Sequence, residues 1–202
     1  MNKKKIYINC YSRTRRDRIA MPMSECLDNH FIGFKGMPPD MDCRGYQYHL
    51  GENIITKELD KDAIYVEGGR YIKIPSGFIS LCSRGLHFCW ELSSVFYYYP
   101  FYEEAPGMYR NRFFIVMSNG KIESSIEKAC TDRLIVLEEI PLYMIKKYRD
   151  ARREIFKSRD LTLSDSDMQA MKESGIHELV ETTVDSFINF NSRGYEYEKI
   201  WT

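Results

Sequence analysis

The stretch Arg112-Phe-Phe-Ile-Val-Met-Ser118 sets five apolar residues between two polar ones and is closed by the turn dipeptide Asn119-Gly120. Aromatic and β-branched residues bounded by a turn predict a strand, and this is the strongest strand pattern in the chain. Residues 133–140 form a second apolar run, which predicts another strand in the interior of the same sheet. Strand patterns therefore dominate up to residue 140.

After Pro141 the apolar residues recur with helical spacing. Residues 142–157 predict a basic amphipathic helix. Ser164 is the expected N-cap of the next helix and Gly175 its expected C-terminal stop, with a further amphipathic helix behind it. The aromatic tail at residues 195–201 is expected to add an edge strand.

Before Arg112, residues 31–36 and 43–51 are expected to be strands, and Gly68-Gly69 is expected to turn a hairpin. Strands first and helices afterwards indicate an α+β fold, a mainly antiparallel sheet followed by C-terminal amphipathic helices. We expect residues 1–141 to form a sheet-rich domain with an N-terminal basic arm. Residues 142–202 should form a helical extension packed on it.

The formal net charge of the 202 residues is zero, but the charges are segregated. Residues 1–20 and 143–159 carry seven Lys or Arg each, against one and two acids, whereas residues 160–202 carry nine acids against three bases. These regions either pair with one another or face a partner. Nucleic acid is a possible partner of the basic regions, but it ranks behind a protein because no nucleic-acid-binding module accompanies them.

The start of the chain has no apolar run of the length a signal peptide needs, and no stretch approaches the ~18 apolar residues of a membrane span. We therefore expect a cytoplasmic protein without membrane contact. In a reducing compartment the six cysteines are expected to be thiols rather than disulfides.

Two motifs concentrate the groups able to do chemistry: Cys-Arg-Gly-Tyr-Gln-Tyr-His-Leu-Gly at residues 43–51, and Cys-Ser-Arg-Gly-Leu-His-Phe-Cys at the start of residues 82–100. Their cysteines and histidines could form a mixed zinc site or a thiolate pair. The spacings match no structural zinc module, and no third orienting group is evident, so buried thiols are preferred. We assign no catalytic residue and no cofactor; the weak metal candidates are Cys43, Cys82 and Cys89.

Arginine before glycine at the mouth of a strand, as at Arg44 and Arg84, can hold a phosphate or carboxylate with its planar guanidinium, or can pair with an internal acid. The aromatic run at residues 96–102 exceeds what one helix face can bury, so some rings should be exposed contact residues. The expected binding residues are Arg44, His49, Arg84, His87, Tyr97, Tyr98, Tyr102, Lys146, Arg149 and Arg153.

These motifs resemble a domain of unknown function found mainly in tailed-phage and prophage proteins. The resemblance covers about residues 31–140, and Leu86 stands where that family more often has an aromatic residue. The matching segments are Lys35-Gly36, residues 43–51, Gly85 to Cys89, Tyr98 to Pro100 and Phe113 to Gly120. The resemblance implies a phage-linked origin rather than a reaction.

From the resemblance, the missing catalytic set, the aromatic residues and the charged helices we expect a phage or prophage accessory protein. It would bind and modulate a host protein, as an anti-CRISPR-like inhibitor of host defence does, in an infected or lysogenic bacterial cell. The alternative, by analogy to ADP-ribosyltransferases, is an NAD-dependent ADP-ribosyltransferase with NAD as cofactor. A virion-associated structural protein is the third possibility. The residues that could fill the enzyme's places are Arg44, Tyr97 to Tyr99, and one of Glu138, Glu139, Glu196 or Glu198.

Overall fold

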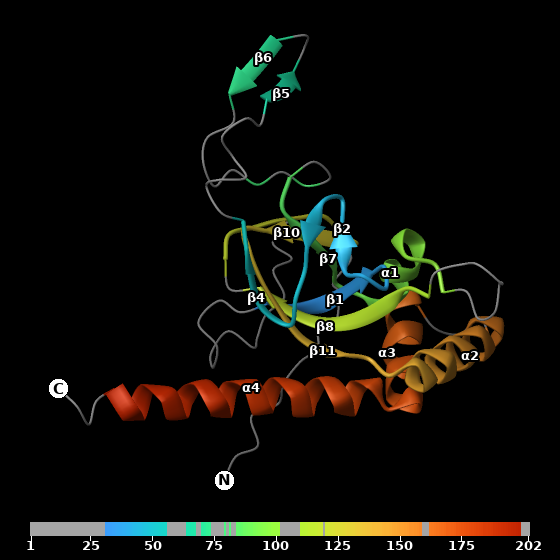
Figure 1. The fold of residues 1–202 in the computed structure, drawn as a ribbon. Coiled ribbons are helices and arrows are strands. Elements are labelled where there is room, and N and C mark those ends of the chain that lie inside the picture. Colours follow the sequence, from blue (N-terminus) through green and yellow to red (C-terminus); the bar gives the residue numbers. More distant parts are fainter. Residues whose placement is uncertain are drawn as a thin grey trace.

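The computed structural model of the chain describes residues 31–55, 64–67, 70–73, 79, 81, 84–101, 110–118, 120–158 and 162–198. It confirms the α+β fold: a seven-stranded antiparallel sheet is followed by helices (Figure 1). The strand order is β4 (Gly51–Ile54), β11 (Arg133–Glu139), β8 (Arg112–Ser118), β1 (Phe31–Met37), β7 (Leu86–Cys89), β10 (Lys128–Thr131) and β9 (Ile122–Ser124).

The middle of the sheet is the pair β1 and β8, which align over seven positions from Phe31↔Ser118 to Met37↔Arg112. Both strands are buried along almost their whole length because each face of the sheet is covered. On one face Phe34 and Ile115 join the cluster that includes the helices. The other face forms a second cluster with Met37, Tyr48, Phe88, Trp90 and Phe114.

The helices are α1 (Leu92–Tyr98), α2 (Leu142–Ser158), α3 (Leu163–Ser174) and α4 (Ile176–Glu198). Figure 1 shows the long α4 running along one side of the sheet, with α2 and α3 beside its start. Leu92 of α1, Ile145 of α2 and Val184 of α4 are buried in the same core cluster as Phe34. The helices thus cover the sheet face from which Phe34 projects.

A buried carboxylate ties three of the helices together. Asp167 Oδ1 of α3 accepts a hydrogen bond from the Ser93 main-chain N–H of α1 at 3.0 Å and another from the Tyr148 hydroxyl of α2. The Arg152 guanidinium lies 4.0 Å from the same oxygen. Burial is the main cause that raises the pKa of Asp167, and the two hydrogen bonds oppose it.

The caps of α3 differ in part from the prediction. Gly175 ends the helix in the left-handed conformation, with φ of 81°, as expected. The N-cap is Thr162 rather than Ser164, since the Thr162 hydroxyl accepts a hydrogen bond from the Asp165 N–H at 3.1 Å. Ser164 lies inside the helix and donates to Glu91 Oε1 at 2.6 Å.

The segment at residues 43–51 is not the single strand that its alternation predicts. It belongs to a hairpin of β2 (Asp42–Cys43) and β3 (Tyr46–Gln47), after which Gly51 begins β4. Arg44 and Gly45 both have positive φ, 59° and 79°, which reverses the chain in two residues. The Asp42 carboxylate accepts the Gly45 N–H at 2.8 Å and stabilises this turn.

Three other expectations can be compared directly. β5 (Ile64–Glu67) and β6 (Arg70–Lys73) form the expected hairpin as a separate two-stranded sheet. The strand predicted at residues 133–140 is β11, inside the sheet between β4 and β8. The edge strand predicted in the tail is wrong for residues 195–198, which continue α4.

Candidate functional site

A cavity of about 600 Å³ opens where two neighbouring strands of the sheet diverge. β1 pairs with β8 over seven positions but with β7 at a single one, Phe34↔Cys89. Beyond this pair the side chain of Lys35, the turn at Arg44 and the start of β7 at Leu86 line the space between the strands. The cavity therefore occupies the place where further hydrogen-bonded pairs between β1 and β7 would otherwise lie.

The end of α1 closes one wall of the cavity. Tyr99 packs directly on the main chain of Gly36, where a Cβ would lie 2.5 Å from the Tyr99 Cβ. The Tyr99 hydroxyl donates to Cys43 Sγ at 3.4 Å, which connects this wall to the β2–β3 hairpin. Glycine at position 36 is what allows the ring to approach the strand so closely.

Cationic side chains from four segments line the cavity: Lys35 of β1, Arg44 of the β2–β3 turn, Arg84 before β7 and Lys128 of β10. None of the described lining residues is Asp or Glu. The pKa of His87, which also lines the space, is lowered mainly by burial and next by Lys35, so its imidazole stays neutral. The lining is thus electropositive, and such a cavity attracts phosphate or carboxylate groups.

Lys35 is the most deeply buried of these cations, with 4% of its surface exposed. Its Nζ donates to the main-chain oxygen of His87 at 2.8 Å and lies 4.3 Å from the centre of the Tyr48 ring. Burial lowers the pKa of Lys35 to about 8, against the opposing effect of the Cys43 and Cys89 thiols. An amine with this pKa is partly unprotonated between pH 7 and 8, whereas an exposed lysine stays charged there.

Tyrosine rings supply the apolar part of the lining. Tyr46 and Tyr48 meet edge to face at 4.7 Å, and the Lys128 Nζ lies 4.7 Å from the centre of the Tyr98 ring. Burial raises the pKa of Tyr48 and of Tyr99, so both phenols stay protonated and can donate hydrogen bonds. Flat rings beside cations are typical of sites that hold a ring-bearing anion.

Two of the predicted metal candidates, Cys43 and Cys89, line this cavity, whereas Cys82 lies outside the described residues. Burial raises the pKa of Cys89 to about 12, so its thiol is neutral and unreactive at physiological pH. Within the part of the chain that the structure describes, no three His, Cys, Asp or Glu side chains are grouped as a metal ion would require.

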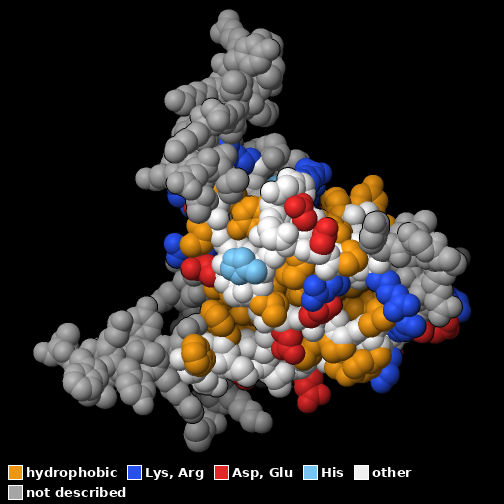
Figure 2. All heavy atoms as spheres, in the orientation of Figure 1, with side chains coloured by type: hydrophobic (Ala, Val, Ile, Leu, Met, Phe, Trp, Pro, Cys, Tyr) orange, Lys and Arg blue, Asp and Glu red, His pale blue; other side chains and the backbone are white. Residues whose placement is uncertain are grey.

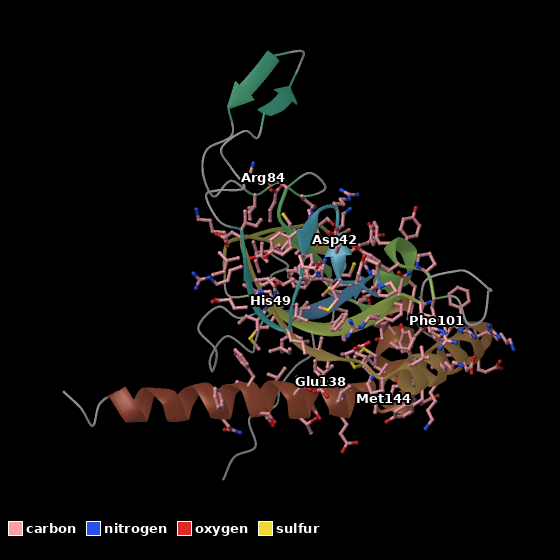
Figure 3. All side chains as sticks on the ribbon, viewed as in Figure 1. Asp42, His49, Arg84, Phe101, Glu138 and Met144 are labelled. Atoms are coloured by element: carbon pink, nitrogen blue, oxygen red, sulfur yellow. The ribbon has the colours of Figure 1, made fainter. Side chains whose placement is uncertain are left out.

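The predicted binding residues separate into two groups. Arg44, Arg84, His87 and Tyr98 line the cavity. His49 does not: it is exposed, and its ring Nδ1 lies 2.9 Å from the Leu50 oxygen. Figure 3 shows Arg84 and Asp42 on one side of the sheet and Glu138 on the other, next to α4.

Those of the remaining predicted residues that the structure describes lie outside the cavity. Tyr97 is 83% exposed beside Tyr98, with 5.2 Å between the ring centres, and Tyr102 is outside the described residues. Lys146, Arg149 and Arg153 lie on α2, where the Arg149 guanidinium covers the Phe101 ring at 5.1 Å. Where α2 and α3 lie, Lys and Arg side chains are interspersed with Asp and Glu (Figure 2).

The glutamates considered for an ADP-ribosyltransferase do not line the cavity where they are described. Glu138 accepts a hydrogen bond from the Thr183 hydroxyl of α4. Glu139 accepts one from Arg112 Nε at 2.9 Å. The side chains of Glu196 and Glu198 lie outside the described part.

Sequence reasoning missed Lys35, Tyr48 and Lys128 as site residues, and it named Tyr99 only for the ADP-ribosyltransferase alternative. Lys35 was detectable, because it is the one charged residue in the otherwise apolar strand Phe-Ile-Gly-Phe-Lys-Gly-Met. A lysine with both sequence neighbours buried must either reach solvent or have a polar partner inside. Tyr48 and Lys128 belong to aromatic or mixed segments in which nothing distinguishes a cavity wall from a core.

Comparison with known proteins gives one match. No curated protein and no solved structure matches the chain. No helix among the described residues is long and apolar enough to cross a membrane. A family model matches just under half of the chain and includes the motif at residues 82–100, but not the one at residues 43–51. The model that matches residues 54–147 is that of a domain of unknown function, DUF7666.

Proposed function

We propose that this protein binds an anionic small molecule that carries a flat ring, of the nucleotide class, in the cavity between β1 and β7. The observation that carries the proposal is the lining: four cationic side chains and several tyrosines, with no acid among the described lining residues. A volume of about 600 Å³ is in the range of small-molecule sites. Arg44 and Arg84 can hold phosphate with planar guanidinium groups, and the tyrosines can stack on a base.

Titration calorimetry with ADP, NAD and adenosine tests this proposal. We expect ADP and NAD to bind and adenosine, which lacks phosphate, to bind much more weakly. Arg84→Ala should weaken binding about tenfold or more, because a hydrogen bond to a charged group contributes about 1.5–3 kcal/mol. Arg153→Ala on α2 is the matched control and should bind as the wild type does.

Equal affinity of the wild type and Arg84→Ala, or no binding of either anionic compound, would exclude this function. The NAD titration also tests the enzyme alternative. Release of nicotinamide during that titration, abolished by Arg44→Ala, would favour an NAD-dependent ADP-ribosyltransferase.

A second candidate function is recognition of a host protein, the role expected of a phage accessory protein with anti-CRISPR-like activity. Tyr97 favours it, since it is 83% exposed and is braced against Tyr98. Exposed tyrosines are frequent anchors of protein interfaces. Capture from a bacterial lysate, compared between Tyr97→Ala and Tyr143→Ala, tests this role. Tyr143 is the control because it is also an exposed tyrosine but lies on α2, away from the cavity.

A further inference from the structure

We propose that Lys35 is a carbonyl-reactive amine, which condenses with the aldehyde of an anionic ligand in the cavity to form an imine. The proposal rests on the cavity described above but not on the ligand being a nucleotide. Lys35 is a primary amine on a rigid central strand, buried to 96% and yet lining a space large enough for a ligand. A lysine desolvated in this way is the usual form of an activated amine nucleophile.

The immediate contacts of Lys35 orient its nitrogen. Donation of one N–H to the His87 oxygen at 2.8 Å holds the amine at the wall of the cavity. When neutral, the nitrogen keeps its lone pair and a second N–H for the ligand side. The Tyr48 ring face favours the charged form, but burial opposes it and has the larger effect on the pKa. At pH 7.5 a lysine with this pKa is about one quarter neutral, against about 0.1% for an exposed lysine.

The reaction is balanced with the amine and the aldehyde alone. The Lys35 nitrogen attacks the carbonyl carbon, a C–N bond forms, and the carbonyl electron pair moves to oxygen, which takes up a proton. The resulting carbinolamine loses its hydroxyl as water after a second protonation, while the nitrogen releases its protons. The products are one imine and one water, and no oxidant or reductant is consumed.

Other side chains of the cavity supply what this chemistry needs. The hydroxyl leaves with a proton from solvent, and the phenols of Tyr48 and Tyr99, which stay protonated because burial raises their pKa, can donate hydrogen bonds to it. Arg44, Arg84 and Lys128 can hold the anionic group of the ligand away from the reacting carbon. The apolar tyrosine faces limit the water that would hydrolyse the imine.

Reductive trapping tests the proposal. The full-length protein is incubated with pyridoxal 5′-phosphate as an anionic aldehyde probe, reduced with borohydride, and mapped by peptide mass spectrometry. We expect initial labelling of Lys35 about tenfold faster than of the exposed Lys147 at pH 7. Pyridoxal, which lacks the phosphate, should label Lys35 more slowly.

Matched variants separate reactivity from binding. Lys35→Arg retains the charge without forming a stable imine and should lose the adduct, whereas Lys147→Met removes an exposed lysine of α2 outside the cavity and should retain it. Should Lys35→Arg fail to fold, the site-resolved pH profile of wild-type labelling decides instead. It should have its midpoint near pH 8, because burial lowers the pKa of Lys35 and outweighs the opposing effect of Cys43 and Cys89. Tyr48 and His87 are the other groups that face the amine.

Labelling spread evenly over surface lysines, or a Lys35 profile with the midpoint of an ordinary lysine, would overturn the proposal. ADP binding without selective labelling would refute the imine while the cavity function stands. Selective labelling without ADP binding would support the imine and refute the nucleotide class.

Discussion

The ring of Tyr99 occupies the space in which a side chain at Gly36 would have to lie. A Cβ at position 36 would lie 2.5 Å from both Cβ and Cγ of Tyr99, closer than any unstrained contact. The two residues are 63 positions apart in a 202-residue chain, and their contact joins the end of α1 to the central strand. The wall of the cavity therefore depends on the absence of a methyl group.

Gly36→Ala is expected to destabilise the protein by about 1–3 kcal/mol, the range for overpacking a buried site. The clash is with the Tyr99 side chain, and Tyr99→Ala removes the ring but keeps Cβ, so the cost should fall in part in that background. A double-mutant cycle by urea unfolding measures this coupling. Gly45→Ala is the control: its Cβ would meet no atom within 4 Å, and it should not couple to Tyr99. Additive effects of Gly36→Ala and Tyr99→Ala would contradict the contact.

Lys35→Met should change how stability depends on pH. Burial lowers the pKa of Lys35 from 10.5 to about 8 in the folded protein. The folded state therefore binds the proton less tightly, and the resulting penalty is fully present below pH 8 and disappears as the pH rises toward 10.5. Between pH 7 and pH 9.5 the unfolding free energy of the wild type should gain about 2 kcal/mol relative to Lys35→Met.

Urea unfolding at the two pH values checks this expectation. Titration of the buried tyrosines is common to both proteins and largely cancels in the difference. Lys147→Met, at an exposed position on α2, should give no comparable change. A difference between the wild type and Lys35→Met that does not vary with pH would show that Lys35 titrates normally.

Asp167→Ala is expected to cost about 3 kcal/mol, because it leaves the buried Tyr148 hydroxyl and Ser93 N–H without their acceptor. Asp167→Asn keeps one acceptor oxygen and should cost less.

Burial raises the pKa of Asp167 above 3.8, so the folded state favours the protonated carboxyl. Stability contributed by that proton is present below pH 3.8 and is lost as the pH rises through the folded pKa.

Thermal unfolding of the wild type and Asp167→Asn across the acidic range tests the direction of this effect. The advantage of the wild type should shrink as the pH increases from 3.8. A wild-type advantage that grows with pH would mean that the hydrogen bonds and Arg152 outweigh burial.

Thr162→Ala should destabilise α3 by about 1 kcal/mol, since it removes the hydroxyl that accepts the Asp165 N–H. Ser164→Ala is the informative comparison, because Ser164 bonds to Glu91 and caps nothing. Chemical denaturation of the two variants distinguishes the roles. A helix-terminal loss of hydrogen-exchange protection is expected for Thr162→Ala alone.

Apolar patterning was sufficient to predict the sheet and the helices, because burial on both faces of β8 and on one face of each helix determines residue type directly. It failed at residues 43–51, where alternation suggested one strand. Arg44 adopts a left-handed conformation that its residue type does not favour, and the adjacent Gly45 and the Asp42 carboxylate stabilise it. The short strand β10 was missed because its four residues carry no clear alternation.

The cavity could be predicted only in part. Arg44 and Arg84 were chosen for their position before glycine, and they do line one cavity. The cavity itself arises from the divergence of β1 and β7, which are about 50 residues apart, and no local pattern encodes where two strands stop pairing. The binding residues expected on α2, Lys146, Arg149 and Arg153, do not line this cavity, and no pattern in the sequence separates them from those that do.

The single paired position between β1 and β7, Phe34↔Cys89, also divides the hydrogen bonding of the sheet into two parts. Strands β4, β11, β8 and β1 form one continuously hydrogen-bonded plate, and β7, β10 and β9 form another. The single paired position between β1 and β7 resists sliding of the strands far less than the seven positions between β1 and β8. Among the strand pairs of this sheet, β1 and β7 share the fewest paired positions, so an occupant that contacts both Lys35 and Arg84 would connect the two halves of the sheet.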